Sequence, residues 1–510
     1  MQVQHRTHEV SMVGNFIAEM REGKVLTFPS HFLKNITTDT GGRTMKDATL
    51  FLSRFAHFFA GQSLIACYHS LRMMPVFISA ELLPIIKKFK GGACPEDLLG
   101  DPKERDDFLS IIKVLKDARI LIQNPIEDDQ ALEYFLGLLG KPYPHLAYFL
   151  LTEKCNFRCG YCFIKNQATI GYKERHMTQE TALKGLDFFC RMIQKDPEQF
   201  EMEKTIVFYG GEPLMNWPVF EMLLSKIRNY KEIGKLPEKT ILNLVTNGTL
   251  LTDRIARILM DNNVQISISI DGDELATNSF RVYTNGKPVY QDIKNGFKIC
   301  KDLGMDIGAS CTLSEANISD FDTTIRILLD ECMVTNMGLN LMITGNQEIV
   351  KDYNEKAAQF IIKAFQIFRE RGVYEDRIMR KVNAFVEKKV WPFDCGATGG
   401  NQIVIAPNGD VGICHGFTAD KKYFPTNIND NDFDISKDST YLEWSMRSPL
   451  NMHQCNDCPA LGICGGGCPF QAEIEKGSIW DLDERFCVHA KLTLEWLIWD
   501  LLKQTQAESI

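Results

Sequence analysis

The chain has 510 residues, of which 45% are hydrophobic and 24% are charged. This length exceeds what a single hydrophobic core supports, so we expect a folded protein of several domains. The formal net charge of -9 argues against a general affinity for nucleic-acid phosphates or anionic lipid, so we expect neither nucleic acid nor membrane as a partner.

The N-terminal segment, residues 1–63, lacks the basic-then-apolar order of a secretory signal. No stretch of the sequence approaches the roughly 20 apolar residues of a membrane span. We therefore expect a cytoplasmic protein. Within this segment FLSRFAHFF (51–59) looks helical, and the rest shows no clear period, so we treat residues 1–63 as an extension whose role stays open.

Residues 64–135 predict a small separate domain. The runs LIACYHSL and PVFIS predict a β-hairpin, and AELLPIIKKF, PEDLL and DDFLSIIKVLKDA predict three helices before a last strand, RILIQN. This order is typical of a winged-helix-like unit. The chain offers the unit no basic recognition helix, so binding to DNA is disfavoured.

Residues 140–350 alternate short β-rich runs with helical patterns whose apolar residues recur every three or four positions. The six candidate strands are 146–152, 204–211, 240–248, 264–272, 305–313 and 337–344. Alternation of this kind predicts an α/β fold built from parallel βαβ units, and six strands suit a partial barrel. Active sites of such barrels lie where the strands end.

The remaining chain divides into three predicted parts. Residues 351–390 predict a helical bridge. Residues 391–492 are short on periodicity and rich in Gly, Pro and Cys, as expected where metal ligation replaces a hydrophobic core. Residues 493–510 predict a buried amphipathic helix, because LTLEWLIWDLL (492–502) is short for a membrane span and carries two acidic residues.

Sixteen cysteines without a secretion signal indicate metal or redox chemistry, because a reducing compartment keeps thiols from forming disulfides. Three of them fall within residues 155–162 and seven within residues 395–487. We expect the six scattered cysteines to be small buried apolar residues. These are Cys67, Cys94, Cys190, Cys300, Cys311 and Cys332.

The first cysteine group, Cys155, Cys159 and Cys162, occupies one short loop directly after a predicted strand. A zinc site normally has four protein ligands, whereas a cubane held by three thiolates keeps one iron open to a cofactor. The loop resembles the signature of the radical S-adenosylmethionine superfamily. The resemblance implies a [4Fe–4S] cluster that binds S-adenosylmethionine and cleaves it to a 5′-deoxyadenosyl radical, with the backbone at Tyr161 near the adenine.

Further motifs follow at the ends of later strands in the order expected of that family. Gly210-Gly211-Glu212-Pro213 resembles its GGEP motif, in which glycines let the backbone approach the methionyl amine. The resemblance implies further cofactor contacts from the residues that end the next strands and from a basic residue beyond them. These are Thr246, Asn247, Ser269, Asp271 and Arg281. The same polar residues also suit strand-end caps and turns, and that alternative stays open.

The second cysteine group contains a CxxC and a CxxxC, which would also suit a zinc ribbon. Its seven positions resemble the SPASM extension of radical enzymes that modify peptides and proteins. The resemblance implies two auxiliary [4Fe–4S] clusters, for three clusters in all. One, here called the outer group, would use Cys455, Cys458, Cys464 and Cys487, and the other, the inner group, would use Cys395, Cys414 and Cys468.

The inner group counts only three cysteines, which predicts an open iron at the cluster nearer the substrate. A thiolate of a substrate cysteine would be a natural fourth ligand. Beside this group His415 is a candidate catalytic residue. Sulfatase-maturing relatives usually carry an aspartate at this position, so His415 makes formylglycine formation doubtful.

The small domain at 64–135 resembles the RiPP recognition element, to which the leader of a precursor peptide adds as a strand. Together these features predict an oxidoreductase that installs thioether crosslinks in a ribosomally made peptide, giving a sactipeptide or ranthipeptide. The expected partners are that precursor peptide and an electron donor such as flavodoxin or ferredoxin. Alternatives are sulfatase maturation, carbon–carbon crosslinking and a catalytically silent, cluster-bearing scaffold that binds peptides.

Overall fold

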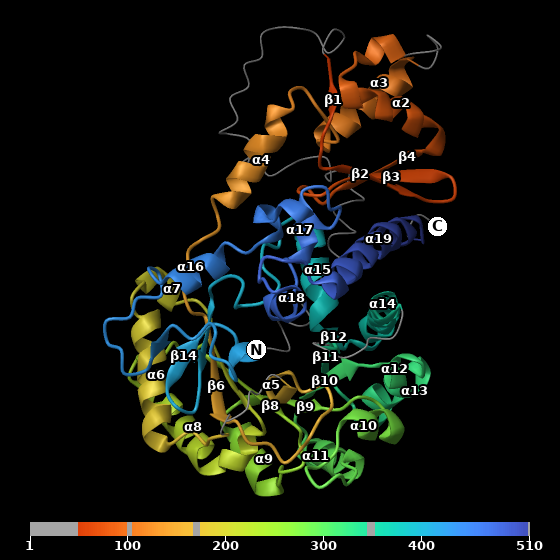
Figure 1. Ribbon diagram of the computed structural model, residues 1–510. Coiled ribbons are helices and arrows are strands. Elements are labelled where there is room, and N and C mark those ends of the chain that lie inside the picture. Colours follow the sequence, from red (N-terminus) through yellow and green to blue (C-terminus); the bar gives the residue numbers. More distant parts are fainter. Residues whose placement is uncertain (1–48, 99–104, 167–173, 344–351, 508–510) are drawn as a thin grey trace.

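The computed structural model describes residues 49–98, 105–166, 174–343 and 352–507. A small N-terminal unit lies at one end of the molecule and the main sheet at the other, and the cysteine-rich region lies between them (Figure 1). None of the described helices has the length and apolar character needed to cross a membrane.

The six predicted strands of the barrel are all present, in sequence order and parallel to one another. Each is a short run of mostly β-branched and apolar residues, the composition that suits a strand covered on both faces. They are β6 (Leu146–Thr152), β7 (Thr205–Gly210), β8 (Ile241–Thr246), β9 (Val264–Ser269), β10 (Ile307–Leu313) and β11 (Asn336–Leu341).

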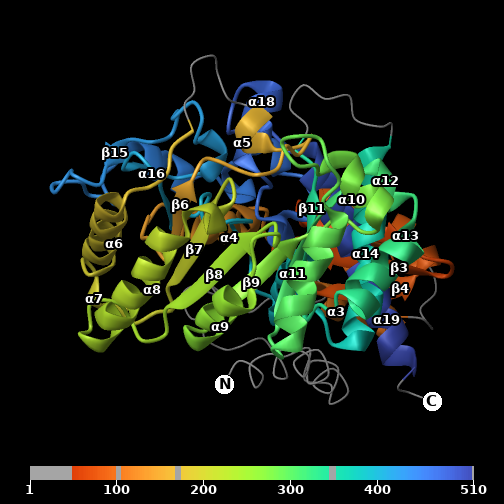
Figure 2. The ribbon, with the colours of Figure 1, turned by 90° about the horizontal axis from the view of Figure 1, so that it is seen from below.

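Helices follow the strands and cover the outer face of the sheet (Figure 2). Several begin at a side-chain cap: the Thr178 hydroxyl accepts from the Thr181 amide at 3.1 Å. The helices are α6 (Gln179–Ile193), α7 (Pro197–Phe200), α8 (Trp217–Glu232), α9 (Asp253–Asp261), α10 (Glu274–Phe280), α11 (Tyr290–Asp302), α12 (Glu315–Ile318) and α13 (Phe321–Arg326).

The sheet extends beyond the six predicted strands to ten. On one edge β12 (Tyr374–Glu375) pairs with β11, and on the other β13 (Gln402–Ile405) pairs parallel with β6, so that Gln402 lies opposite Leu146. Two antiparallel strands, β14 (Asp410–Gly412) and β15 (Thr426–Asn427), complete that edge. The cysteine-rich region therefore shares a sheet with the barrel.

The N-terminal unit differs from expectation at its start, because FLSRFAHFF is not helical. It forms β1 (Phe51–Leu52) and β2 (Ala56–Ala60), and β2 pairs with β3 (Leu64–His69), which pairs with β4 (Pro75–Ser79). Pairing with β3 overrides the local helical pattern. The three-stranded sheet thus begins before residue 64, the expected start of this domain.

Short helices and a last strand follow this sheet. They are α2 (Leu83–Lys87), α3 (Arg105–Asp117) and β5 (Leu121–Ile122), and β5 pairs with β1 and not with the hairpin. Apolar residues of the strands, of α3 and of the turn after α2, among them Ile65, Ile112 and Phe89, form a core separate from that of the barrel. The helix α4 (Ile126–Leu136) then leads from this unit to the barrel.

The helical bridge and the C-terminal helix pack against each other beside the cysteine-rich region. The bridge consists of α14 (Tyr353–Arg371) and α15 (Asp376–Glu387). The C-terminal helix α19 (Glu484–Ala507) starts earlier than the expected residue 493. An ion pair of 2.8 Å between Arg369 and Asp500 joins α14 to α19. The remaining helices of this region are α16 (Ser439–Ser445), α17 (Leu461–Cys464) and α18 (Pro469–Lys476).

Asp128 on α4 ties the N-terminal unit together, and its replacement tests that connection. Its carboxylate accepts from the Ser53 hydroxyl and from the Arg54 amide, each at 2.8 Å. We expect Asp128→Ala to lower the local stability of the unit by about 1–3 kcal/mol, because the buried Ser53 hydroxyl and the partly buried Arg54 amide lose their acceptor. Hydrogen exchange of the β2, β3 and β4 amides measures this.

The neighbouring Asp129 provides the control. Its side chain is 66% exposed and forms only a surface ion pair with Arg54. Asp129→Ala should change the stability by about 0–1 kcal/mol. Equal effects of the two substitutions would contradict a role for the Asp128 hydrogen bonds.

Candidate functional site

A cavity of about 490 Å³ lies where the parallel strands end. It is lined by all three cysteines of the first group and by the three cysteines of the inner group. The outer group is not part of its lining. The volume lies within the range usual for sites that bind cofactors and small ligands.

The loop that carries Cys155, Cys159 and Cys162 is fixed from one side by the segment after α10. The Gly160 amide donates to the Phe280 carbonyl, and the Arg158 amide to the Val282 carbonyl, each at 2.8 Å. Phe157 is buried below the loop. Burial raises the pKa of the Cys155 thiol to about 12 and that of Cys159 to about 11.

Gly210 and Gly211 hold the stem of this loop from the other side. A Cβ atom on Gly211 would lie 2.1 Å from the Lys154 carbonyl oxygen, and one on Gly210 would lie 2.2 Å from the Thr152 oxygen. The Gly211 amide donates to Thr152 at 2.8 Å, and the Glu212 amide donates to Lys154 at 2.9 Å. Only glycine permits this close approach, so the motif positions the cysteine loop itself.

Glu212 joins the ends of two neighbouring strands. Its fully buried carboxylate accepts from the Thr246 hydroxyl at 2.7 Å, from the Asn247 amide at 2.7 Å and from the Leu214 amide at 3.0 Å. Burial raises the pKa of Glu212 to about 7, although the three donors favour the carboxylate. Pro213 begins the turn that follows.

Asn247 connects this corner to the cysteine loop. Its side-chain amide donates to the Asn156 side chain at 2.8 Å. Thr246 and Asn247 therefore serve as strand-end contacts within the protein, and both also line the cavity together with Ser269. Their predicted contacts with a cofactor stay predictions.

Asp271, after β9, and Arg281, at the end of α10, form a buried ion pair. The Arg281 Nε and Nη2 atoms lie 2.8 and 3.1 Å from the two Asp271 oxygens. Asp271 also accepts from the Tyr161 hydroxyl, and the Arg281 guanidinium lies 5.4 Å from the centre of the Tyr161 ring. The pair thus orients Tyr161, and Arg281 lines the cavity with part of its guanidinium already occupied.

Two of the seven downstream cysteines have neighbours from their own predicted group. Burial and the neighbouring Cys468 and Cys395 thiols raise the pKa of Cys414. Burial raises the pKa of Cys487 to about 12, with further contributions from the Cys464, Cys455 and Cys458 thiols. The division into two ligand sets stays a prediction. Of the scattered cysteines, Cys94 is half-buried and the other five are buried.

His415 lies against three aromatic rings at the cavity wall. Its ring centre is 4.7 Å from that of Tyr148, 5.1 Å from Tyr209 and 5.5 Å from Phe163. Burial lowers the pKa of His415 to about 4, so the imidazole is neutral at physiological pH. Its Nδ1 atom has no hydrogen-bond partner among the described residues.

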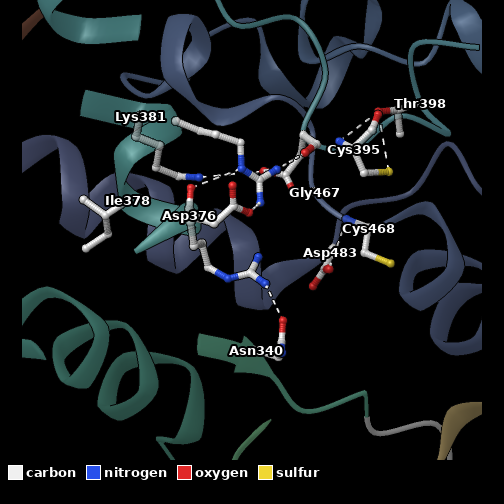
Figure 3. A network of polar contacts seen from close by, with 12 residues as sticks. Asn340, Asp376, Ile378, Lys381, Cys395, Thr398, Gly467, Cys468 and Asp483 are labelled. Atoms are coloured by element: carbon white, nitrogen blue, oxygen red, sulfur yellow. Dashed lines mark hydrogen bonds and ion pairs between the residues drawn. The ribbon is translucent and has the colours of Figure 1, made fainter. Parts of the chain in front are cut away.

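Arginines form the wall beside the inner group, and sequence reasoning missed them. Arg380 pairs with Asp376 at 2.7 Å and donates to the Asp394 carbonyl, next to Cys395. Figure 3 shows the sulfur atoms of Cys395 and Cys468 pointing to the same side, away from this polar network. The cationic residues at 377, 380 and 381 are spaced three and four positions apart and share one face of α15. That spacing could have predicted a positively charged helix face from the sequence.

The comparisons with known proteins agree with this geometry. Residues 149–328 match the family described as Radical SAM superfamily, and this range begins within β6 and contains the cysteine loop. The chain carries a radical SAM domain.

Two relatives and one solved structure place the domain among similar proteins. The radical SAM cyclopropyl synthase TigE of Paramaledivibacter caminithermalis is 29% identical over 68% of this chain and 73% of its own length. The cysteine-type anaerobic sulfatase-maturating enzyme of Clostridium perfringens is 22% identical over 65% of this chain and 88% of its own. The solved structure of native anSMEcpe with bound AdoMet and Cp18Cys peptide covers 72% of this chain and 100% of its own, with 18% identity and a TM-score of 0.59. That likeness shows the fold.

A radical SAM domain implies S-adenosylmethionine and a [4Fe–4S] cluster, and the donor set fits them. Soft thiolates at the cavity wall suit iron–sulfur clusters, and binding of a cluster would displace the protons that burial otherwise retains. Within the described ranges, no three His, Cys, Asp or Glu side chains converge as ligands of one metal ion do.

Gly211→Ala tests how the cysteine loop is positioned. We expect the variant to lose most of the iron bound at the first cysteine group, because the new methyl group would displace the Lys154 backbone. Iron content after anaerobic reconstitution measures this, in a background with the inner and outer cysteines replaced. Gly91→Ala is the control, since nothing lies within 4 Å of its Cβ position. Normal iron content in Gly211→Ala would contradict the prediction.

Proposed function

We propose that this protein is a peptide-modifying radical SAM enzyme whose substrate occupies the cavity between the first cysteine group and the inner group. One observation carries the proposal: both groups line the same cavity. When bound, S-adenosylmethionine and its cluster supply a radical that removes a hydrogen atom from a substrate carbon. The first group would hold that cluster, and the inner and outer groups would hold two auxiliary clusters.

The finer proposal is thioether formation. Joining a cysteine sulfur to a carbon removes two hydrogen atoms in all, so one electron beyond the abstracted hydrogen atom needs an acceptor beside the substrate. The inner group stands at that place, with three cysteine ligands and room for a substrate thiolate as the fourth.

His415 supports peptide crosslinking over sulfatase maturation. The position offers a neutral imidazole packed among aromatic rings, where a carboxylate base is usual in sulfatase-maturing relatives. The unpartnered Nδ1 atom is available to a polar group of the substrate. We propose that His415 positions the peptide in the cavity.

The N-terminal unit would bind the leader of the precursor peptide. Its three-stranded sheet has β2 and β4 as edges, and a leader strand can add to such an edge through backbone hydrogen bonds. The unit lies next to the cysteine-rich region, beyond α17 (Figure 1). A leader held there leaves the rest of the peptide free to reach the cavity. A cytoplasmic flavodoxin or ferredoxin would supply the electrons.

A second candidate is carbon–carbon bond formation within the peptide. The relative TigE favours it, because that protein is a cyclopropyl synthase and a cyclopropyl ring requires a new carbon–carbon bond. The same cavity and the same removal of two hydrogen atoms would serve this reaction, with no cysteine in the substrate.

Cys159→Ala separates an enzyme from a silent scaffold. We expect the reconstituted, reduced wild-type protein to release 5′-deoxyadenosine from S-adenosylmethionine. The variant should lose at least about 100-fold of this activity, because the cluster would lose one of its three thiolate ligands. Chromatography of the nucleoside products measures it. Cys190→Ala, in the buried core of α6, should retain the activity. A wild-type protein without nucleoside release would favour the scaffold.

A cysteine-containing precursor peptide separates the two crosslinking reactions. For thioether formation we expect the peptide to change the electron paramagnetic resonance signal of the inner cluster, and the product to resist alkylation at one cysteine. The matched control is the same peptide with that cysteine replaced by serine, which should leave the signal unchanged. A product that has lost two hydrogen atoms yet keeps every cysteine alkylatable would favour carbon–carbon bond formation.

A further inference from the structure

Arg447 is fully buried directly after α16, and its hydrogen bonds all end on backbone carbonyls. Nη1 donates to Gly466 at 2.9 Å and to Gly467 at 3.4 Å, Nη2 donates to Asp481 at 3.1 Å, and Nε donates to Ile479. None of these acceptors carries a charge. The guanidinium is therefore satisfied as a hydrogen-bond donor but not as a cation.

The segment that Arg447 holds connects the two auxiliary cysteine groups. Gly465, Gly466 and Gly467 link Cys464 of the outer group to Cys468 of the inner group. All three glycines have positive φ, at 72°, 86° and 69°, a conformation that other residues adopt only with strain. The Gly465 carbonyl accepts from the Asp394 amide at 2.8 Å, so each carbonyl of the link has a donor.

No carboxylate of the described residues forms an ion pair with Arg447, because its acidic neighbours are held by other cations. Asp483 pairs with Arg485, whose Nη2 lies 2.7 Å from it. Asp394 lies 3.6 Å from Arg380 and 3.9 Å from Lys381. The remaining ionisable neighbours are thiols of both groups, Cys468, Cys395 and Cys464. A buried cation without a counter-charge is strongly disfavoured. We therefore expect these cysteines to carry an anionic group when the protein is in its functional state.

Arg447 does not line the substrate cavity, so a direct role in binding the peptide is excluded. Clusters bound by thiolates carry net negative charge, and a buried positive charge beside them favours their reduced form, because Coulomb attraction grows with each added electron. The side chain reaches both groups through one link, and it can therefore act on both clusters.

We propose that Arg447 is the shared counter-charge of the two auxiliary clusters, and that it sets their reduction potentials while holding the Cys464–Cys468 link. The inference rests on the proposed function, which assigns clusters to these cysteines. Arg447 is a positioning residue in this account, since it acts through the clusters and touches no substrate.

The test compares Arg447→Gln and Arg447→Lys in the fully reconstituted enzyme. Redox titration followed by electron paramagnetic resonance measures the potential of each cluster. We expect Arg447→Gln to shift both auxiliary potentials to more negative values and to leave the cluster at the first cysteine group unchanged. Arg447→Lys keeps the charge and should retain potentials close to wild type. Arg254→Gln, with the arginine 75% exposed on α9, is the control that should change nothing.

The outcomes distinguish a role for the positive charge of Arg447 from a purely structural role of its side chain. Loss of the auxiliary clusters in Arg447→Gln, with retention in Arg447→Lys, also supports the counter-charge. Unchanged potentials in a loaded Arg447→Gln, equal shifts in both variants, or loss of the clusters in both would overturn it. Iron analysis of the wild type separates the two proposals, because iron for one cluster alone would refute the auxiliary clusters themselves and with them the inference.

Discussion

The parallel pairing of β13 with β6 is the contact on which the site depends. β6 leads into the loop of Cys155, while β13 lies between Cys395 and Cys414, and the register places Gln402 beside Leu146. Cys395 comes before β13, and Cys414 comes after β14, which runs antiparallel to β13, so both cysteines lie near the start of β13 and beside the start of β6. The cavity reaches from there to the loop that follows β6. Two cysteine groups more than 200 residues apart in the chain therefore face one cavity.

Burial of anionic sulfur groups explains much of the polar structure around that cavity. Thiolates and carboxylates cannot be buried without donors or cations close by. On the barrel side, Arg281 pairs with Asp271 and Glu212 receives three hydrogen bonds. On the other side, Arg380 and Arg447 stand beside the auxiliary groups. Arg281 and Arg380 have carboxylate partners, whereas Arg447 forms no ion pair with a described carboxylate, so its burial is costly unless the neighbouring sulfur groups carry negative charge.

Sequence and structure diverge where tertiary pairing outweighs local preference. The run FLSRFAHFF has helical spacing, yet β3 offers it an edge and it becomes β1 and β2. The polar residues at the strand ends were predicted as cofactor contacts or as caps, and Thr246, Asn247 and Asp271 make hydrogen bonds within the protein. The spacing of Arg377 and Arg380 places them on one face of α15, but it does not show which part of the protein that face contacts.

The sequence by itself determined the six parallel strands and the cysteine loop, because hydrophobic periodicity and cysteine spacing are properties of short stretches of the chain. Only the tertiary structure decided that the cysteine-rich region joins the barrel sheet, that Gly210 and Gly211 brace the cysteine loop, and that Arg447 is buried with hydrogen bonds to backbone carbonyls alone. These features depend on which distant segments of the chain contact each other, and such contacts produce no periodic pattern in the sequence.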